Sequence, residues 1–146
     1  MRSFLYAFCG IAHALRTERH MRIHFCFAFY VIAGGLTVGL SAAEWGVVLI
    51  CCGAVIGMEC VNTALERLCD RVTVERDDLI MHAKDAAAGA VLVCALFSVA
   101  AGCVIFFSGD RPRRALEFFS HDPVRALLLA LSIVIWILMI FGRKNK

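Results

Sequence analysis

The sequence lacks several motifs that would place it in a common soluble class. Its eight cysteines form no Cys-x-x-Cys pair, and no cysteine and histidine lie at zinc-finger spacing, so nothing indicates a zinc module or a disulfide framework. There is no G-x-x-x-x-G-K-[ST] loop, the usual phosphate-binding loop of nucleotide enzymes. The basic residues form no patch interleaved with aromatics, so we expect no nucleic-acid partner.

Apolar residues dominate what is present. The chain has 146 residues, 61% of them hydrophobic, with a mean hydropathy of +0.79. This composition is typical of a polytopic membrane protein rather than a soluble domain. Because a membrane helix takes about 20 residues, the length allows about three or four spans with short connections. We therefore predict an all-α membrane protein.

The long apolar segments set the expected spans. We predict transmembrane helices at 23–40, 45–65 and 86–107, and a fourth, C-terminal one at 124–141, joined by a tight turn at 41–44 and solvated loops at 71–81 and 108–122. Residues 3–15 are amphipathic but too short to span, which indicates an N-terminal surface helix. The alternative for this segment is a signal peptide, with Ala12-His13-Ala14 as the cleavage site.

Arginine and lysine are unevenly distributed between the connections. They precede the first span, lie between the second and third, and end the chain, whereas residues 41–44 have none. The positive-inside rule then places the first three groups in the cytoplasm. The loop at 108–122 would lie outside although it contains three arginines, which disagrees with the same rule.

A polar stripe interrupts the end of the second span. At helical periodicity Glu59, Asn62, Glu66 and Asp70 share one face over three turns, with Thr63 beside them. A charged side chain inside a membrane costs about 2.5–3.5 kcal/mol on insertion scales, so such residues are functional candidates. The alternative is that the stripe only joins helices by hydrogen bonds.

These residue types suit phosphoryl transfer. One carboxylate could act as a general base on a hydroxyl, and others could hold Mg²⁺, which takes carboxylate and phosphate oxygens. Lys84, at the mouth of the third span, could contact phosphates, since this reaction depends mainly on positioning and charge neutralisation. A proton- or ion-coupled carrier, or a non-enzymatic membrane subunit, would also account for the stripe.

Two longer motifs carry a family resemblance. Glu59-x-x-Asn62-Thr63-Ala-x-Glu66-x-x-x-Asp70, followed by Lys84-Asp85-x-Ala-Ala-Gly-Ala-Val, resembles the prokaryotic diacylglycerol kinase/undecaprenol kinase family. The segment from Thr17-Glu18-Arg19 to Arg22-Ile-His24 is similar to the same family. The resemblance covers about residues 3–107 and implies a small three-span membrane kinase with an N-terminal surface helix, working as a homotrimer with shared active sites in the bacterial inner membrane.

The resemblance also implies roles for individual residues. Glu59 matches the catalytic base, and Glu18 and Glu66 match ligands of the Mg²⁺ that accompanies ATP. Nucleotide contacts would come from these two glutamates and from Glu75, Asp77, Lys84 and Asp85. Site support or substrate binding would come from Asn62, Asp70, Arg22 and Ala88.

The sequence departs from the family pattern at two positions. Asp77 stands where many members have a histidine, and Ala88 stands where Gram-negative diacylglycerol kinases tend to have a serine. The second difference favours undecaprenol over diacylglycerol as the lipid. We predict a lipid kinase core at 1–107 and a C-terminal extension at 108–146, outside the resemblance, for which the sequence indicates no function.

Overall fold

The computed structural model describes residues 2–72 and 77–142, and within these ranges all regular structure is helical. The helices are α1 (Arg2–Thr17), α2 (Arg19–Val38), α3 (Ala42–Val72), α4 (Asp78–Phe106), α5 (Arg111–Ser120) and α6 (Pro123–Phe141). Four of them, α2, α3, α4 and α6, are long and apolar enough to cross a membrane. The predicted all-α membrane fold is therefore confirmed, including the fourth long C-terminal helix.

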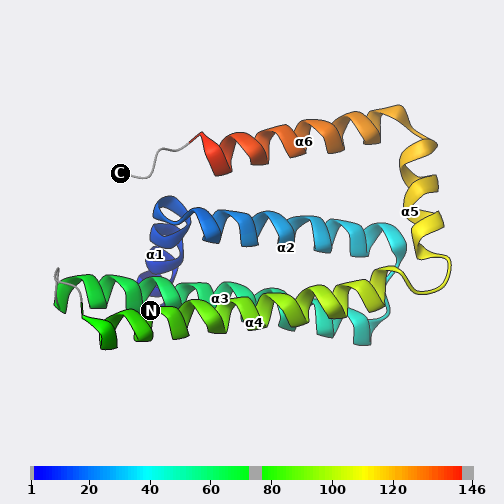
Figure 1. The fold of residues 1–146 in the computed structure, drawn as a ribbon. Helices are drawn as coiled ribbons and strands as arrows, with labels where there is room; N and C mark the ends of the chain where they lie inside the picture. Colours follow the sequence, from blue (N-terminus) through cyan, green and yellow to red (C-terminus); the bar gives the residue numbers. More distant parts are fainter. Residues whose placement is uncertain (1, 73–76, 143–146) are drawn as a thin grey trace.

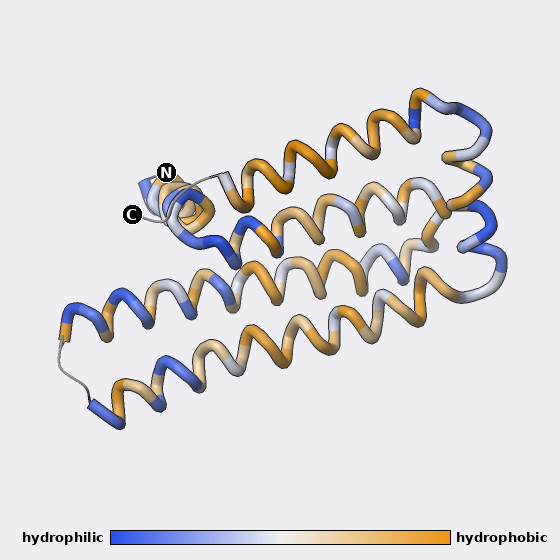
Figure 2. Tube along the Cα trace, turned by 45° about the horizontal axis from the view of Figure 1, so that its top comes forward, coloured by the Kyte–Doolittle hydropathy of each residue, from blue (hydrophilic) through white to orange (hydrophobic). Residues whose placement is uncertain are grey.

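The four long helices lie side by side in layers (Figure 1). α3 and α4 form an antiparallel pair, α2 packs on this pair, and α6 packs on the other side of α2. α1 lies crosswise at the end where α2 begins, and α5 lies at the opposite end. Apolar residues fill the middle of the long helices, while hydrophilic residues gather near both ends (Figure 2).

The turn between α2 and α3 is encoded by its local sequence. Gly39 ends α2 with a φ of +73°, in the left-handed region where a side chain would be strained. The backbone N–H and hydroxyl of Ser41 both donate to the Glu44 carboxylate, at 2.9 and 2.7 Å. The Ser41 hydroxyl in turn accepts from the Glu44 N–H at 3.4 Å, and this reciprocal cap starts α3. The tight turn predicted at 41–44 is wrong in position, because the chain turns at 39–41 and residues 42–44 already belong to α3.

The loops predicted at 71–81 and 108–122 are wrong, because both stretches are largely helical. α3 continues to Val72 and α4 already begins at Asp78, so much of 71–81 is helical. Asp77 explains the early start of α4, because its carboxylate accepts from the N–H groups of Leu79 and Ile80.

The second stretch, 108–122, contains α5. Pro112 lies in the first turn of this helix, where its missing N–H is tolerated. Ion pairs one turn apart, Arg113–Glu117 and Arg114–Asp110, support it.

Candidate active site

One face of α3 changes from apolar to polar along its length. Its buried side chains are Val48 and Val55, followed by Glu59, Asn62 and Thr63. Val48, Val55, Glu59 and Asn62 follow one another at seven, four and three residues, which keeps them on one face, and Thr63 lies beside Asn62. Glu59 is only 4% exposed, although it carries a carboxylate. The first half of the predicted polar stripe, Glu59, Asn62 and Thr63, is therefore directed into the bundle, while Glu66 is partly accessible and Asp70 is exposed.

Asn62 leaves part of its bonding capacity unused. Its Nδ2 donates to Oε1 of Glu66 at 3.0 Å, one turn further along α3. Its Oδ1 is buried and has no hydrogen-bond partner among the described residues. A buried acceptor without a partner is costly, so this oxygen is available to a donor that binds at the site.

Glu18 lies at the junction of α1 and α2. It occupies the N-cap position of α2, yet its side chain makes no capping bond. Instead its Oε1 accepts from Arg67 of α3 and from Thr17, both at 3.0 Å. Glu18 and Glu66 both lie near enough to Glu59 for their charges to act on it, as does His20. The structure therefore brings together three of the predicted carboxylates, two from α3 and one from the junction of α1 and α2.

The remaining predicted nucleotide residues lie along the start of α4. Lys84 Nζ donates to Oδ1 of Asp70 on α3 at 2.5 Å, while Asp85 and Ala88 are exposed. Asp77 serves as the N-cap of α4. Glu75 lies outside the described residues.

Arg22 is buried where three helices meet. It is 2% exposed, and its guanidinium lies 3.3 Å from the carbonyl oxygen of Arg16 and 3.5 Å from that of Ile140. These carbonyls belong to the ends of α1 and α6, which carry partial negative charge. Arg22 therefore joins these helix ends within the bundle.

The donor chemistry at this end suits a magnesium ion. Among the described residues no group of three or more His, Cys, Asp or Glu side chains is arranged to hold a metal. Mg²⁺, however, typically uses one or two protein carboxylates and completes its shell with water and substrate phosphates. Glu18 and Glu66, both partly accessible, could supply those two carboxylates.

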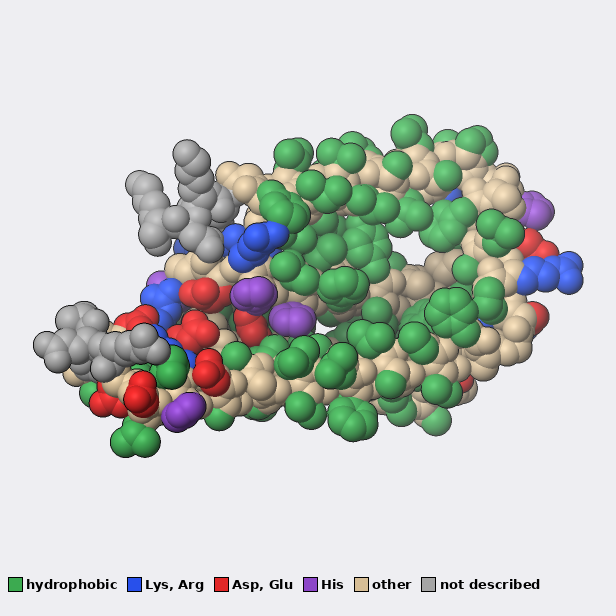
Figure 3. Space-filling model, in the orientation of Figure 1, with side chains coloured by type: hydrophobic (Ala, Val, Ile, Leu, Met, Phe, Trp, Pro, Cys, Tyr) green, Lys and Arg blue, Asp and Glu red, His purple; other side chains and the backbone are tan. Residues whose placement is uncertain are grey.

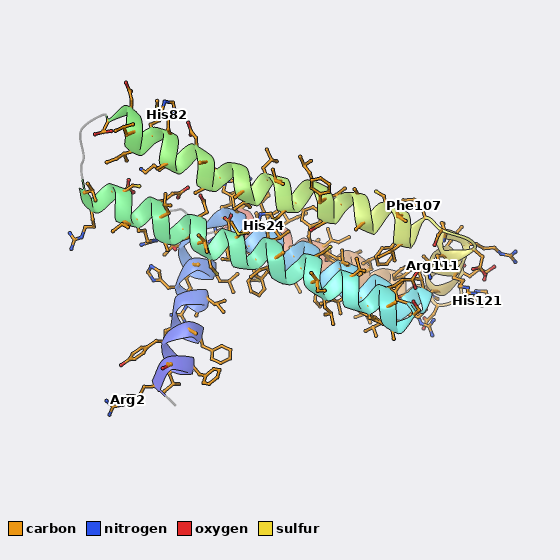
Figure 4. All side chains as sticks on the ribbon, turned by 90° about the horizontal axis from the view of Figure 1, so that it is seen from below. Arg2, His24, His82, Phe107, Arg111 and His121 are labelled. Carbon is orange, nitrogen blue, oxygen red and sulfur yellow. The ribbon has the colours of Figure 1, made fainter. Side chains whose placement is uncertain are left out.

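Charged residues gather at both ends of the molecule (Figure 3), and the candidate site lies in the group at the α1 end. Figure 3 shows acidic, basic and histidine side chains grouped near α1, with hydrophobic side chains over the long helices. An apolar groove of about 370 Å³ runs between α2, α3 and α4. His24 and Val55 line one end of the groove, and Phe106 and Phe107 line the other. His24 lies toward the α1 end and Phe107 toward the opposite end (Figure 4). The groove stops one helical turn short of Glu59.

Sequence reasoning missed two residues of this cluster. Arg67 has no role among the predicted site residues, but its guanidinium donates to Glu18 across 49 residues of sequence. His20 likewise has no predicted site role, but its charge acts on Glu59. Both side chains are basic, as expected of residues that pair with a cluster of carboxylates. The sequence alone does not show which carboxylate each of them would approach.

The fold and the cluster define a multi-pass membrane protein with a carboxylate site at one end of its helices. Residues 5–106 match the family model for prokaryotic diacylglycerol kinase. The chain is 40% identical over 105 residues to an undecaprenol kinase of Bacillus subtilis, covering 72% of this chain and 85% of that protein. It therefore belongs to the prokaryotic diacylglycerol kinase family and is a lipid kinase.

The match to a second relative covers a smaller share of that relative's length. The chain is 38% identical over 106 residues to a diacylglycerol kinase of Synechocystis, covering 70% of this chain and 60% of that protein. No solved structure matches the chain. The roles of individual site residues remain predictions.

Proposed function

We propose that the protein transfers the γ-phosphate of ATP to the hydroxyl of undecaprenol and forms undecaprenyl phosphate. The observation that carries the proposal is the buried carboxylate of Glu59 on a membrane-helix face, near the carboxylates of Glu18 and Glu66. Lys84 lies further along the same end of the bundle, where it pairs with Asp70. The choice of undecaprenol is supported by the Bacillus relative, which this chain matches over most of its length, and by Ala88.

Diacylglycerol is the second candidate substrate. The Synechocystis relative, which is named a diacylglycerol kinase, favours this substrate. The match covers a smaller share of that relative's length than of the Bacillus relative's length. Both lipids present a hydroxyl attached to a hydrocarbon body, so the same carboxylate chemistry would serve either.

Glu59 is the proposed general base. Its position inside the helix bundle would let it reach a hydroxyl that remains at membrane depth. It would take the proton as the hydroxyl oxygen attacks the γ-phosphorus and the bond to the bridging oxygen breaks, which releases ADP. Asn62 would orient the hydroxyl or a bound water through its unpartnered Oδ1. Thr63, buried beside it, keeps this part of the site polar.

Glu18 and Glu66 are the proposed holders of Mg²⁺ with ATP. A bound magnesium ion neutralises phosphate charge and orients the phosphates for transfer. Lys84, released from Asp70, would contact the phosphates, with Asp77 and Asp85 nearby on α4 and Glu75 as a further nucleotide contact. Arg22 and Asp70 support the site from its edges.

The lipid would approach laterally within the membrane. The apolar groove between α2, α3 and α4 ends one turn before Glu59, so a hydrocarbon chain lying there would direct its hydroxyl toward the carboxylates. The excess of arginine at this end of the bundle favours a cytoplasmic orientation, where ATP is available. By family resemblance we also propose a homotrimer with shared active sites.

Radiolabelled ATP tests this function. Purified protein in mixed micelles with Mg²⁺ would receive undecaprenol or diacylglycerol separately, with Glu59→Gln as the blank. We expect label on undecaprenol. Label on diacylglycerol alone would contradict the substrate assignment, and label on neither lipid by folded protein would contradict the proposed reaction.

A further inference from the structure

The C-terminal helix α6 lies outside residues 5–106, which match the family, yet it contacts the part of α2 closest to the site. It runs antiparallel to α2 along its length (Figure 1). Near the middle, the hydroxyls of Tyr30 and Ser132 lie 2.9 Å apart, and the rings of Phe29 and Trp136 have centroids 6.2 Å apart. These contacts fix the register of α6 on α2.

That register brings the last turn of α6 to the first turn of α2. The guanidinium carbon of Arg19 lies 4.2 Å from the centroid of the Phe141 ring, a cation–π geometry. One turn along α2, the guanidinium of Arg22 lies 3.5 Å from the Ile140 carbonyl. Both arginines thus contact the C-terminal end of α6, where helix carbonyls favour positive charge.

The same short segment carries Glu18. Residues 16–22, which we call the hinge, join α1 to α2, and Arg67 of α3 holds Glu18 from the opposite side. The hinge is therefore restrained by α3 through Glu18 and by α6 through Arg19 and Arg22. If one restraint loosens, the Glu18 carboxylate gains freedom relative to Glu59 and Glu66.

We infer that α6 is a positioning element of the active site, with Phe141 and Arg19 as positioning residues that hold the hinge and hence Glu18. The consequence for catalysis rests on the proposed function, in which Glu18 holds the metal–nucleotide complex. The inference gives the C-terminal extension a role that the family core alone does not supply.

The test compares Phe141→Ala with Leu138→Ala in the full chain. The two side chains lie in the last turn of α6 and are similarly exposed, at 63% and 64%, but the arginine contact belongs to Phe141. We expect Phe141→Ala to raise the KM for Mg-ATP about two- to fivefold with kcat nearly unchanged. Phe141→Tyr should restore the KM, and Leu138→Ala should leave it at the wild-type value.

Hydrogen exchange of the hinge amides gives a readout that does not need catalysis. Exchange at residues 16–22 should be faster in Phe141→Ala than in Leu138→Ala and normal in Phe141→Tyr. If Phe141→Ala and Leu138→Ala agree in both KM and hinge exchange, the inference is overturned. If the wild-type protein phosphorylates no lipid, the proposed function fails instead, and the exchange comparison still decides whether α6 holds the hinge.

Discussion

The two ends of the helix bundle use their charged residues differently. At the α5 end, Arg111 Nη2 donates to Glu44 Oε2 and Arg111 Nη1 forms an ion pair with Oε1, each at 2.8 Å. Ser41 donates to the same carboxylate. The other α5 arginines are paired with Asp110 and Glu117. Charge at this end is matched locally, as expected of groups that hold helices together.

At the α1 end the polar groups are less completely matched. Glu59 is buried near two further carboxylates, Glu18 and Glu66. Among the described residues, Asn62 Oδ1 and Arg22 Nε are buried without a hydrogen-bond partner. Unused bonding capacity in buried groups costs stability, so its concentration at one end indicates a site adapted to bind something. The α5 end therefore serves mainly to hold the helices together, and the α1 end carries the functional site.

Replacing Glu59 should have the largest effect. Glu59→Gln keeps the shape of the side chain but removes its ability to take a proton, so kcat for lipid phosphorylation should fall by about 10²–10⁴-fold. The KM for ATP should change little, because Glu59 is not a proposed nucleotide contact. Steady-state transfer of labelled phosphate measures both values. Retention of half the wild-type kcat would show that another group is the base.

Replacing Glu66 should weaken metal binding. Glu66→Gln removes a carboxylate charge, and we expect the Mg²⁺ concentration for half-maximal activity to rise about 10- to 100-fold. Excess chelator should abolish wild-type activity. Asp110→Asn, which removes a carboxylate at the α5 end, is the control and should leave the Mg²⁺ titration unchanged. Equal titrations for the two variants would remove Glu66 from the metal site.

Replacing Lys84 should affect nucleotide affinity. Lys84→Met loses a charge-assisted contact to phosphate, so the KM for ATP should rise about tenfold, whereas Lys84→Arg should recover part of the loss. ATP titrations at saturating lipid would measure this. Unchanged KM in Lys84→Met would mean that Lys84 serves only its ion pair with Asp70.

Replacing Arg111 should affect stability alone. Arg111→Ala breaks the paired contact with Glu44 and should lower the Tm in detergent by several degrees. Activity per folded molecule should remain at the wild-type level. Arg113→Ala, whose side chain is 80% exposed, should lower the Tm much less. A large loss of kcat in folded Arg111→Ala would contradict the division between the two ends.

The sequence predicted the helices and the α3 stripe because both follow from local periodicity. Apolar runs long enough to span mark the helices, and a period of 3.6 residues fixes which side chains share the face of Glu59. α5 was missed because its charge density suggested a loop. The ion pairs one turn apart, such as Arg113–Glu117, were a readable helix signal.

Contacts between distant segments could not be predicted in the same way. The Glu18–Arg67 pair spans 49 residues, and the contact of Arg22 with Ile140 spans 118. Both depend on which helices pack together and in what register. Nothing in the apolar sequence of α6 specified that it would lie on α2 rather than on α3 or α4.

The most direct test is to make the same substitution at two positions of α3, one in the candidate site and one at the α5 end. Glu59→Gln and Glu44→Gln each remove one carboxylate charge, from the α1 end and the α5 end respectively, and would be compared in single-turnover transfer of the γ-phosphate of ATP to undecaprenol. We predict that Glu59→Gln slows transfer by at least about a hundredfold, while folded Glu44→Gln transfers phosphate at nearly the wild-type rate. Equal rates for the two variants would contradict the assignment of catalysis to the α1 end.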